Sequence, residues 1–433
     1  MSAATILRGR LLRWEGDPFE IGDEALVWEE DGAVAVADGR IASVGPAAQV
    51  LAAHPGAEVR HRPRAVIAPG FVDCHVHPFQ TPIIASWGAQ LIDWLNGYTF
   101  PEEARCADPA HAAEVARLFF DEQLRNGYTA CCAFGTIHEA AMDAFFSEAQ
   151  ARGLRALGGK MMMDRNAPPN LCEGAQEAFD RSAALIARWH GAGRLGYAIA
   201  PRFAPTSTPE LLEAAGALAR AHPDCAIETH LSENPAEISW VAELFPQARD
   251  YLDVYERFGL LSPRAIFGHA IHLSARERAR LAEVGAAVAH CPTSNHFLGS
   301  GACDVAGLKA MGVRVGLATD TGGGSSFSPF ATMRAAYELG QSRGAALTPA
   351  QLWRLATAGA AEAMGFGDRI GDLAEGMEAD AVLLDPEATP LLAARSARAE
   401  SPASLLFALI ILGDDRCVLE SWSGGRRTHS RDS

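Results

Sequence analysis

The stretch Ala65-Val-Ile-Ala-Pro-Gly-Phe-Val-Asp-Cys-His-Val-His77 is an apolar run that ends in two histidines. Side chains alternate between faces along a β-strand, so histidines at positions i and i+2 point the same way. Two imidazoles in this arrangement can bind one cation, at roughly 2.0–2.1 Å for zinc. At a strand end they could instead hydrogen-bond to loop carbonyls, so His75 and His77 alone do not establish a metal site.

Apolar runs alternate with amphipathic helical patterns from about residue 65 to residue 365. Eight strands with intervening helices predict a (β/α)₈ barrel, an α/β fold. An open doubly wound sheet is the alternative, but no glycine-rich nucleotide turn follows an early strand. The expected strands are 66–74, 128–134, 156–163, 196–203, 226–230, 265–269, 286–291 and 313–319. The expected helices include 110–125, 176–189, 209–221 and 275–284, the last two with N-caps at Thr208 and Ser274.

The two ends of the chain have a different pattern. Residues 1–64 contain short strand patterns with turn signals at Glu30-Asp31-Gly32 and Asp38-Gly39, and 379–384 and 417–422 are strand candidates near the other end. We expect 1–64 and 370–433 to form one small β-domain, with 65–369 as the barrel. Residues 387–403 are expected to form a late helix or a partner-facing segment.

Composition excludes several classes of protein. With 48% hydrophobic and 21% charged residues, the 433-residue chain resembles an ordinary globular protein. A net charge of −16 argues against nucleic acid as a partner. No apolar stretch is long enough for a membrane span, and the N-terminal residues lack the apolar core of a signal peptide. The nine cysteines show no disulfide-type spacing, so we expect buried thiols and a cytoplasmic location.

Further polar residues follow the later expected strands. His230, His269 and Asp320 end the fifth, sixth and eighth strands, where barrel enzymes place their active sites. Glu233 lies just beyond His230, where a carboxylate could shuttle protons for a metal-bound water. Each has a simpler alternative: Glu233 could begin a helix, and Asp320 could cap a loop as an Asx turn. Together with the two histidines of the first strand, these residues favour a hydrolytic metal site.

Other glutamate, lysine, histidine and cysteine residues near the expected strand ends are expected to have structural roles or to face solvent. We expect Glu228 and Glu237 to be structural or solvated, and Lys160 to be structural rather than a metal bridge. His272 lies in a loop, and His290 is expected to order the loop after the seventh strand. Cys74 and Cys291 are expected to be packing residues.

Taken together, these residues resemble the metal-dependent amidohydrolase superfamily and, within it, the guanine deaminase family. The resemblance spans nearly the whole chain. Its narrower signals are Tyr98-Thr-Phe-Pro101 and Pro201-Arg-Phe-Ala-Pro-Thr-Ser-Thr208, joined by Thr229-His-Leu-Ser-Glu-Asn234, His290-Cys-Pro-Thr-Ser-Asn295 and Thr319-Asp-Thr-Gly-Gly-Gly324. Pro78-Phe79 and His296 are departures that leave the catalytic groups intact.

The resemblance implies a role for each matching position. It implies that His75, His77, His230 and Asp320 bind one zinc ion per subunit, with iron or manganese as alternatives. It implies that His269 lies beside the metal-bound water and that Glu233, with Asp320, moves protons. Gln80, Arg202 and Phe203 match residues that hold a purine ring, with His77, His230, Glu233 and Asp320 also facing the substrate.

The activity implied is hydrolysis of guanine to xanthine and ammonia by a cytoplasmic homodimer. The nearest alternative is an aminohydrolase of a related ring such as 8-oxoguanine, a pterin or a triazine, in which Gln80, Arg202 and Phe203 accept a different ring edge. A non-catalytic scaffold is the alternative from another class. A scaffold of this kind would be expected to have lost some of the metal ligands or the proton-carrying glutamate, whereas the sequence contains all of them.

Overall fold

The computed structural model describes residues 4–87 and 91–432. The chain divides into two compact units, one formed by residues 1–72, 121–130 and 327–433 and the other by 73–120 and 131–326. Strands β5 (Phe71–Val76) and β6 (Tyr128–Phe134) contribute residues to both. The limits of these two units fall inside strands and differ from the domain limits expected from the sequence, which therefore stay a prediction.

A (β/α)₈ barrel is the main element of the fold. Its sheet has the order β13-β12-β11-β10-β9-β7-β6-β5, and β8 pairs with β9 beyond the end of β7. The neighbouring strands from β7 to β13 pair in parallel. After β5 and β6, the strands are β7 (Arg155–Gly159), β8 (Met161–Met162), β9 (Leu195–Pro201), β10 (Ala226–Leu231), β11 (Ala265–His269), β12 (Ala287–His290) and β13 (Arg314–Leu317).

The expected strands are confirmed to within a few residues, with two interruptions. The predicted strand 66–74 is divided at Gly70 between β4 (Glu58–Pro69), which belongs to the other sheet, and β5 of the barrel. The predicted strand 156–163 is divided at Lys160 into β7 and β8. At the end of β7, a Cβ on Gly159 would lie 1.9 Å from the carbonyl oxygen of Ala198. Only glycine allows the two backbones to approach this closely.

Polar groups join the last strand of the barrel to the first. The side chain of Asp73 accepts hydrogen bonds from the backbone N–H of Thr319 (3.0 Å) and from its hydroxyl (2.6 Å). One residue further, the N–H of Asp320 donates to the carbonyl of His75 at 3.1 Å. These bonds fix the position of Asp320 against the histidines of β5.

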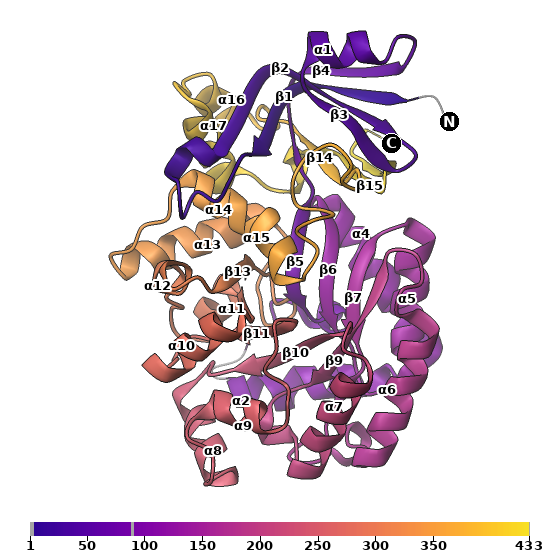
Figure 1. Cartoon of the computed structure of the whole chain (residues 1–433), viewed down its shortest axis with the longest axis vertical. Coiled ribbons are helices and arrows are strands. Elements are labelled where there is room, and N and C mark those ends of the chain that lie inside the picture. Colours follow the sequence, from indigo (N-terminus) through magenta and orange to yellow (C-terminus); the bar gives the residue numbers. More distant parts are fainter. Residues whose placement is uncertain (1–3, 88–90, 433) are drawn as a thin grey trace. The chain divides into compact units, whose positions relative to one another are not determined.

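Helices connect the strands and pack outside them. Figure 1 shows α5 (Glu139–Arg152), α6 (Ala175–Trp189) and α7 (Pro209–Ala221) beside β7 and β9, with which they make contacts. The others in this part of the chain are α2 (Leu91–Trp94), α3 (Phe100–Arg105), α4 (Pro109–Arg125), α8 (Pro235–Leu244), α9 (Tyr251–Arg257), α10 (Ala275–Val284), α11 (Pro292–Phe297) and α12 (Val305–Ala310). A π-helical turn, Leu95–Thr99, separates α2 from α3. Both predicted N-caps, Thr208 and Ser274, accept a backbone N–H from the first helical turn.

The two ends of the chain share one seven-stranded sheet, of order β16-β15-β14-β4-β1-β2-β3 (Figure 1). Its strands are β1 (Thr5–Trp14), β2 (Leu26–Ala37), β3 (Arg40–Pro46), β4 (Glu58–Pro69), β14 (Ala381–Leu384), β15 (Val418–Ser423) and β16 (Arg426–Ser430). Strand β14 pairs antiparallel with β4, so residues more than 300 positions apart are hydrogen-bonded neighbours. The prediction of a β-sheet built from both termini is confirmed.

One predicted turn in this sheet is wrong. Glu30-Asp31-Gly32 lies inside β2, where the register against β1 shifts between Gly9 and Leu11. A Cβ on Gly32 would lie 2.4 Å from the Cβ of Leu11, so this glycine serves a bulge and not a chain reversal. The Asp38-Gly39 turn is confirmed, and both residues have positive φ.

The remaining helices are α1 (Ala47–Ala53), α13 (Pro329–Ser342), α14 (Pro349–Ala356), α15 (Ala358–Ala363), α16 (Pro390–Ser396) and α17 (Pro402–Leu412). The segment 387–403, expected to form a late helix or a partner-facing segment, contains α16, which ends at Ser396, and the start of α17, which begins at Pro402 with Ser401 as N-cap. Eight of the nine cysteines are buried, as the sequence predicts. Among residues 4–87 and 91–432, no helix is long and apolar enough to cross a membrane.

Candidate active site

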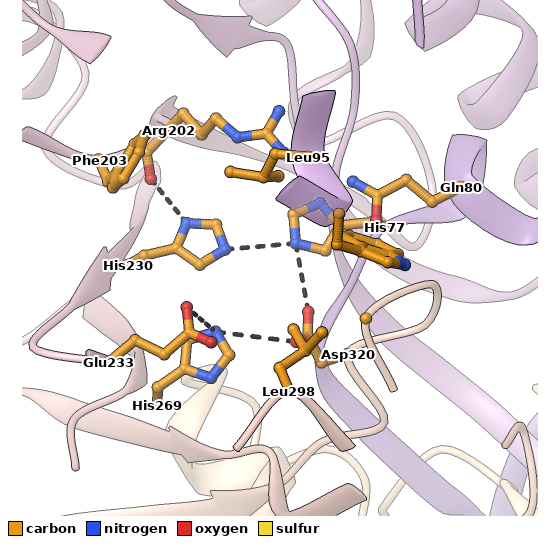
Figure 2. Close-up of a pocket in the computed structure, with 12 residues that line it drawn as sticks. His77, Gln80, Leu95, Arg202, Phe203, His230, Glu233, His269, Leu298 and Asp320 are labelled. Atoms are coloured by element: carbon orange, nitrogen blue, oxygen red, sulfur yellow. Dashed lines mark hydrogen bonds and ion pairs between the residues drawn. The ribbon is translucent and has the colours of Figure 1, made fainter. Parts of the chain in front are cut away.

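Five predicted side chains converge at the C-terminal ends of the barrel strands. His75 Nε2 and His77 Nε2 lie 3.4 and 3.3 Å from Asp320 Oδ1, and His77 Nε2 lies 3.3 Å from His230 Nε2. His269 Nε2 lies 3.7 Å from Asp320 Oδ2. Figure 2 shows four of these side chains, those of His77, His230, His269 and Asp320, pointing toward one another.

These separations fit the coordination of one metal ion. Two ligands at 2.0–2.1 Å with a tetrahedral angle lie roughly 3.4 Å apart. Ligand atoms of His75, His230, His269 and Asp320 all lie within 4.8 Å of one another. His77 is equally close to His230 and Asp320, so five side chains compete for the usual four positions. The ligand set expected from the sequence, with His77 in place of His269, therefore stays a prediction.

Hydrogen bonds orient the imidazole rings. Nδ1–H of His230 donates to the carbonyl of Arg202 at 2.6 Å, and Nδ1–H of His269 donates to Oδ1 of Asn295 at 2.8 Å. In each ring Nε2 is thereby left as the metal-facing nitrogen. Both ring nitrogens of His75 are buried, and neither forms a hydrogen bond with another described residue, so Nε2 is available to a metal ion.

The electrostatics of the cluster also suit a cation. Burial lowers the pKa of His77 to about 4 and that of His230 well below its ordinary value, which keeps both rings neutral, as metal ligands must be. Burial acts to lower the pKa of His75 as well, but contacts with Asp320 and Glu228 outweigh it and raise the pKa to about 10. The two carboxylates thus favour positive charge at this point.

Several strand ends at the site have unusual backbone geometry. Ser232, His269 and Asp320 have φ values of 50°, 66° and 50°, in the left-handed region that non-glycine residues rarely adopt. Such strain is commonly retained where function requires a particular side-chain direction. At these three residues the positive φ angles turn the chain sharply at the ends of β10, β11 and β13, next to the converging side chains.

A pocket with about 430 Å³ of empty space, part of it open to solvent, opens onto the cluster. Figure 2 shows the cluster on one side, with Gln80, Arg202, Phe203 and Leu95 nearby. All seven residues expected to face a substrate line this pocket: His77, Gln80, Arg202, Phe203, His230, Glu233 and Asp320. Trp94, Leu95 and Leu298 add apolar surface, which suits a flat ring.

Glu233 is held by the segment that follows β10. Its Oε1 accepts a hydrogen bond from the hydroxyl of Ser300 at 2.9 Å, and its Oε2 lies 3.5 Å from His269 Nε2. Glu237 accepts the backbone N–H groups of Glu233 and Asn234, and Asn234 caps α8. Glu233 itself lies before that helix, so its carboxylate is available to the pocket and is not used as a cap.

Gln80 and Arg202 share a partner that the sequence did not suggest. Glu103 accepts a hydrogen bond from Gln80 Nε2 at 2.8 Å and two from Arg202 Nη1 at 2.8 and 3.1 Å. The guanidinium of Arg202 also lies over the ring of Phe100, 5.4 Å from its centroid. Two of the expected ring-binding side chains are thus joined through one buried carboxylate.

Glu228 has the structural one of the two roles expected for it, with a partner that the sequence did not predict. It is completely buried, not solvated, and its Oε1 lies 3.3 Å from His75 Nδ1. Glu103, Asn295 and Ser300 were also missed. Their identities carry no local signal, because each acquires its partner only through folding.

The residues given lesser roles lie apart from the cluster. His272 donates to the carbonyl of Ser300 at 2.8 Å, and Lys160 is buried against the carboxylate of Glu173. Cys74 and Cys291 donate to backbone carbonyls inside the barrel. His296 is exposed on α11 and does not line the pocket.

A second set of possible metal ligands, His190, Asp224 and Cys225, is explained by internal hydrogen bonds. Nδ1 of His190 accepts the N–H of Tyr197 at 3.0 Å, so the ring proton resides on Nε2. That proton is donated to Asp224 at 3.0 Å. Neither nitrogen is left for a metal ion, and the converging cluster at the strand ends is the better candidate.

Known proteins of one family match most of this chain. The amidohydrolase family matches residues 66–428, and a bacterial imidazolonepropionase-like composite domain matches residues 32–57. The chain is 40% identical to a guanine deaminase of Escherichia coli strain K12, covering 96% of this chain and 95% of that protein. It is 43% identical to a probable guanine deaminase of Deinococcus radiodurans over 99% of both chains.

Solved structures show the same similarity. The guanine deaminase of E. coli superimposes with a TM-score of 0.96 at 39% identity, covering 99% of this chain and 100% of that one. A guanine deaminase of C. acetobutylicum with guanine bound in its active site has a TM-score of 0.88 at 27% identity, over 98% and 99% of the chains. An adenosine deaminase of Xanthomonas campestris with bound zinc has a TM-score of 0.86 at 27% identity, over 98% and 92%.

Proposed function

The chain belongs to the amidohydrolase family and, within it, to the guanine deaminases, and on this premise we propose that it hydrolyses guanine to xanthine and ammonia. The observation that carries the proposal is that possible metal ligands and possible ring-binding side chains line the same pocket. A cluster of histidines and a carboxylate suited to a metal ion faces Gln80, Arg202 and Phe203, which are suited to a planar ring with polar edges.

The ring-binding side chains differ in what they offer. A glutamine amide and an arginine fork pair with carbonyl and N–H groups on a heterocycle, and Phe203 lies along the pocket to stack on its face. Trp94, Leu95 and Leu298 add apolar surface around these polar groups. This arrangement supports a nucleobase as substrate.

We propose zinc as the metal ion, held by His75, His77, His230 and Asp320. Three neutral imidazoles and a carboxylate are a typical donor set for a zinc site with catalytic function, although iron and manganese accept similar sets. When bound, the ion supplies Lewis acidity that makes a water molecule nucleophilic at neutral pH. Metal analysis of the purified protein tests the identity of the ion.

Glu233 is the proposed proton carrier. It takes a proton from the attacking water and passes it to ring atom N3 while the oxygen forms a bond to C2. The remaining hydroxyl proton then moves through Asp320 or Glu233 to the exocyclic amine, the C2–N bond breaks, and ammonia leaves. Because Nδ1–H of His269 donates to Asn295, its Nε2 carries no proton and, 3.5 Å from Glu233 and 3.7 Å from Asp320, is placed to accept a hydrogen bond from the attacking water. General acid–base action of this kind contributes about 10²–10⁴-fold to a rate.

The first experiment is ammonia release from the metal-loaded protein with guanine, adenine, cytosine, 8-oxoguanine and ammeline side by side. Strong preference for guanine, with an equal amount of xanthine, is the expected result. Activity on another ring alone would keep the hydrolytic mechanism but overturn the roles of Gln80, Arg202 and Phe203. Absence of turnover on all five compounds, with one metal ion bound per chain, would contradict the proposal and favour a non-catalytic scaffold.

We also propose that the protein acts as a cytoplasmic homodimer. Buried thiols are compatible with a reducing compartment, and the homodimer is what the family resemblance implies. Light scattering of the purified chain measures its mass in solution, and a monomer under assay conditions would remove the dimer from the proposal.

A further inference from the structure

Glu103 occupies an unusual position beside the pocket. Its side chain is 1% exposed and does not line the pocket, yet both residues it binds do. Gln80 comes from the 3₁₀ turn Pro78–Ile83 after β5, Arg202 follows β9, and Glu103 lies on α3, just after the π-helical turn. A single carboxylate therefore joins three separate parts of the barrel rim.

The chemistry of a carboxylate restricts how Gln80 is oriented. An ionised glutamate accepts hydrogen bonds and cannot donate them, whereas the glutamine amide has one donor end and one acceptor end. The 2.8 Å bond from Gln80 Nε2 to Glu103 Oε1 therefore commits the donor end. The carbonyl oxygen of Gln80 is left for the pocket as an acceptor. In Figure 2 the amide nitrogen points toward the side that carries Arg202.

Arg202 is restricted in the same way. Its Nη1 donates to both oxygens of Glu103 and lies 2.9 Å from the sulfur of Met161, while Phe100 packs against the guanidinium face. Because the charge of Glu103 balances that of Arg202, the pair offers donors without a net positive charge. Arg202 thus presents N–H groups to a ring, and Gln80 presents an oxygen.

The oxygen of Gln80 and the N–H groups of Arg202 together match the N1 and C6 groups of guanine but not those of 2,6-diaminopurine. Guanine has a carbonyl at C6 and an N–H at N1, so it offers an acceptor beside a donor. In 2,6-diaminopurine these groups are reversed, with an amino donor at C6 and an acceptor at N1, while the reacting 2-amino group is the same. A site with fixed hydrogen-bonding groups rejects a ring that leaves those groups unpaired.

We propose that Glu103 is a positioning residue that sets this selectivity, by holding Gln80 with its oxygen, and Arg202 with its N–H groups, toward the ring. The inference rests on the proposed function, since it names what selects the substrate of the same pocket. In Glu103→Gln the new side-chain amide can donate to Gln80 as well as accept from it. The amide of Gln80 could then turn over, and its donor end could meet N1 of 2,6-diaminopurine.

The test is the ratio of kcat/KM for guanine to kcat/KM for 2,6-diaminopurine, measured from ammonia release by metal-loaded protein. Glu103→Gln is expected to lower this ratio by about tenfold, the value of one hydrogen bond of roughly 1.4 kcal/mol, mainly through the KM for guanine. Glu103→Asp keeps an acceptor-only group and is expected to retain the wild-type ratio, even where both rates fall.

Glu102→Gln is the matched control. Glu102 is the neighbouring residue, is also buried, and binds His111 at 2.7 Å and Arg105 at 2.8 Å instead of the pocket residues. It is expected to leave the ratio unchanged. Equal losses on both substrates in Glu103→Gln, or a shift as large in Glu103→Asp or Glu102→Gln, would overturn the inference. Wild-type protein that releases no ammonia from guanine would instead refute the proposed function, so the two failures are distinct.

Discussion

Oε1 of Glu228 lies 3.3 Å from Nδ1 of His75, and both side chains are completely buried. The other ring nitrogen of His75 faces Asp320 at 3.4 Å. A carboxylate behind a ligating histidine fixes the ring and increases its basicity toward a metal ion. Glu228 thus supports the metal site from inside the barrel, two positions before His230 on the same strand.

Glu228→Gln should weaken metal binding by roughly 10–100-fold, the usual cost of losing such a partner. The measurement is metal retained per chain after equilibration with a chelator of graded concentration. Glu102→Gln, which removes a buried carboxylate far from His75, is the control. If Glu228→Gln retains metal as tightly as the wild type does, Glu228 only fills space in the barrel.

Glu233→Gln should keep its metal ion and lose turnover by about 10²–10⁴-fold, because an amide cannot carry the proton. The KM should change little, since the amide is similar in size. Metal content and single-turnover rates separate the two effects. Glu243→Gln, exposed on the following helix, is the control and should behave like the wild type. Turnover near the wild-type rate in a metal-loaded Glu233→Gln sample would end the proposed role.

Asp253 on α9 should contribute stability that depends on pH. Burial acts to raise its pKa, but hydrogen bonds from Arg249 (2.9 Å) and Arg257 (2.8 Å) outweigh burial and hold the pKa well below its ordinary value. A depressed carboxyl pKa stabilises the fold above the unfolded-state value, near 3.8, and the effect is lost as the pH falls below it.

Asp253→Asn should therefore lower the free energy of unfolding by roughly 1–2 kcal/mol at pH 7, a modest value because the arginines are partly exposed. The difference from the wild type should shrink as the pH is lowered from 5 to 3. Urea unfolding at each pH measures it. Asp368→Asn, at an exposed position, should show no such trend, and a constant difference at all pH values would contradict the assignment.

The buried pair of Lys160 and Glu173 should be structural and not part of the metal site. Burial lowers the pKa of the lysine and raises that of the glutamate, so each depends on the other to remain charged. Lys160→Met should destabilise the protein by about 3 kcal/mol, because it leaves a buried carboxylate whose remaining ion pair among the described residues is with Arg181, at 3.5 Å. Thermal unfolding measures the loss.

Adding Glu173→Leu to Lys160→Met should restore much of that stability, since neither charge then remains buried. Metal content should equal that of the wild type in both variants. Loss of the metal ion from Lys160→Met would show that Lys160 acts at the cluster, contrary to its position against Glu173.

The sequence predicted what depends on local pattern. The apolar run 265–269 and the N-caps Thr208 and Ser274 match the structure, because strand length and capping are encoded by adjacent residues. The signal at Glu30-Asp31-Gly32 was misleading, since a glycine serves a bulge or a turn equally well and only the strand opposite decides. Lys160, at which the predicted strand is divided, likewise has its partner, Glu173, 13 positions away, and no local pattern indicates it.

In the candidate site, too, local features could be predicted and long-range contacts could not. Side chains at strand ends could be predicted, because parallel strands of a barrel bring their C-terminal ends together. Their supports could not. Glu103 meets Arg202 across 99 positions and Asn295 meets His269 across 26, and nothing in the residues around either one indicates its partner.

His77 and His269 differ in how closely they approach the other possible metal ligands. His77 Nε2 lies 3.3 Å from both His230 and Asp320, whereas the approaches of His269 Nε2, to Glu233 and Asp320, are 3.5 and 3.7 Å. The shorter separations favour His77 as the ligand, with His269 beside the reacting oxygen. His77→Ala should therefore lose the metal ion, and His269→Ala should retain one ion per chain while kcat falls by about 10²-fold or more.

Metal analysis after gel filtration, paired with kcat on reloaded protein, measures both effects. His272→Ala is the control, because that histidine binds the carbonyl of Ser300 and lies outside the cluster. Retention of metal in His77→Ala together with its loss in His269→Ala would assign the site to His75, His230, His269 and Asp320. His77, which lines the pocket, would then be the residue left to contact the substrate, and the hydrogen bond from His269 to Asn295 would serve to orient a ligand.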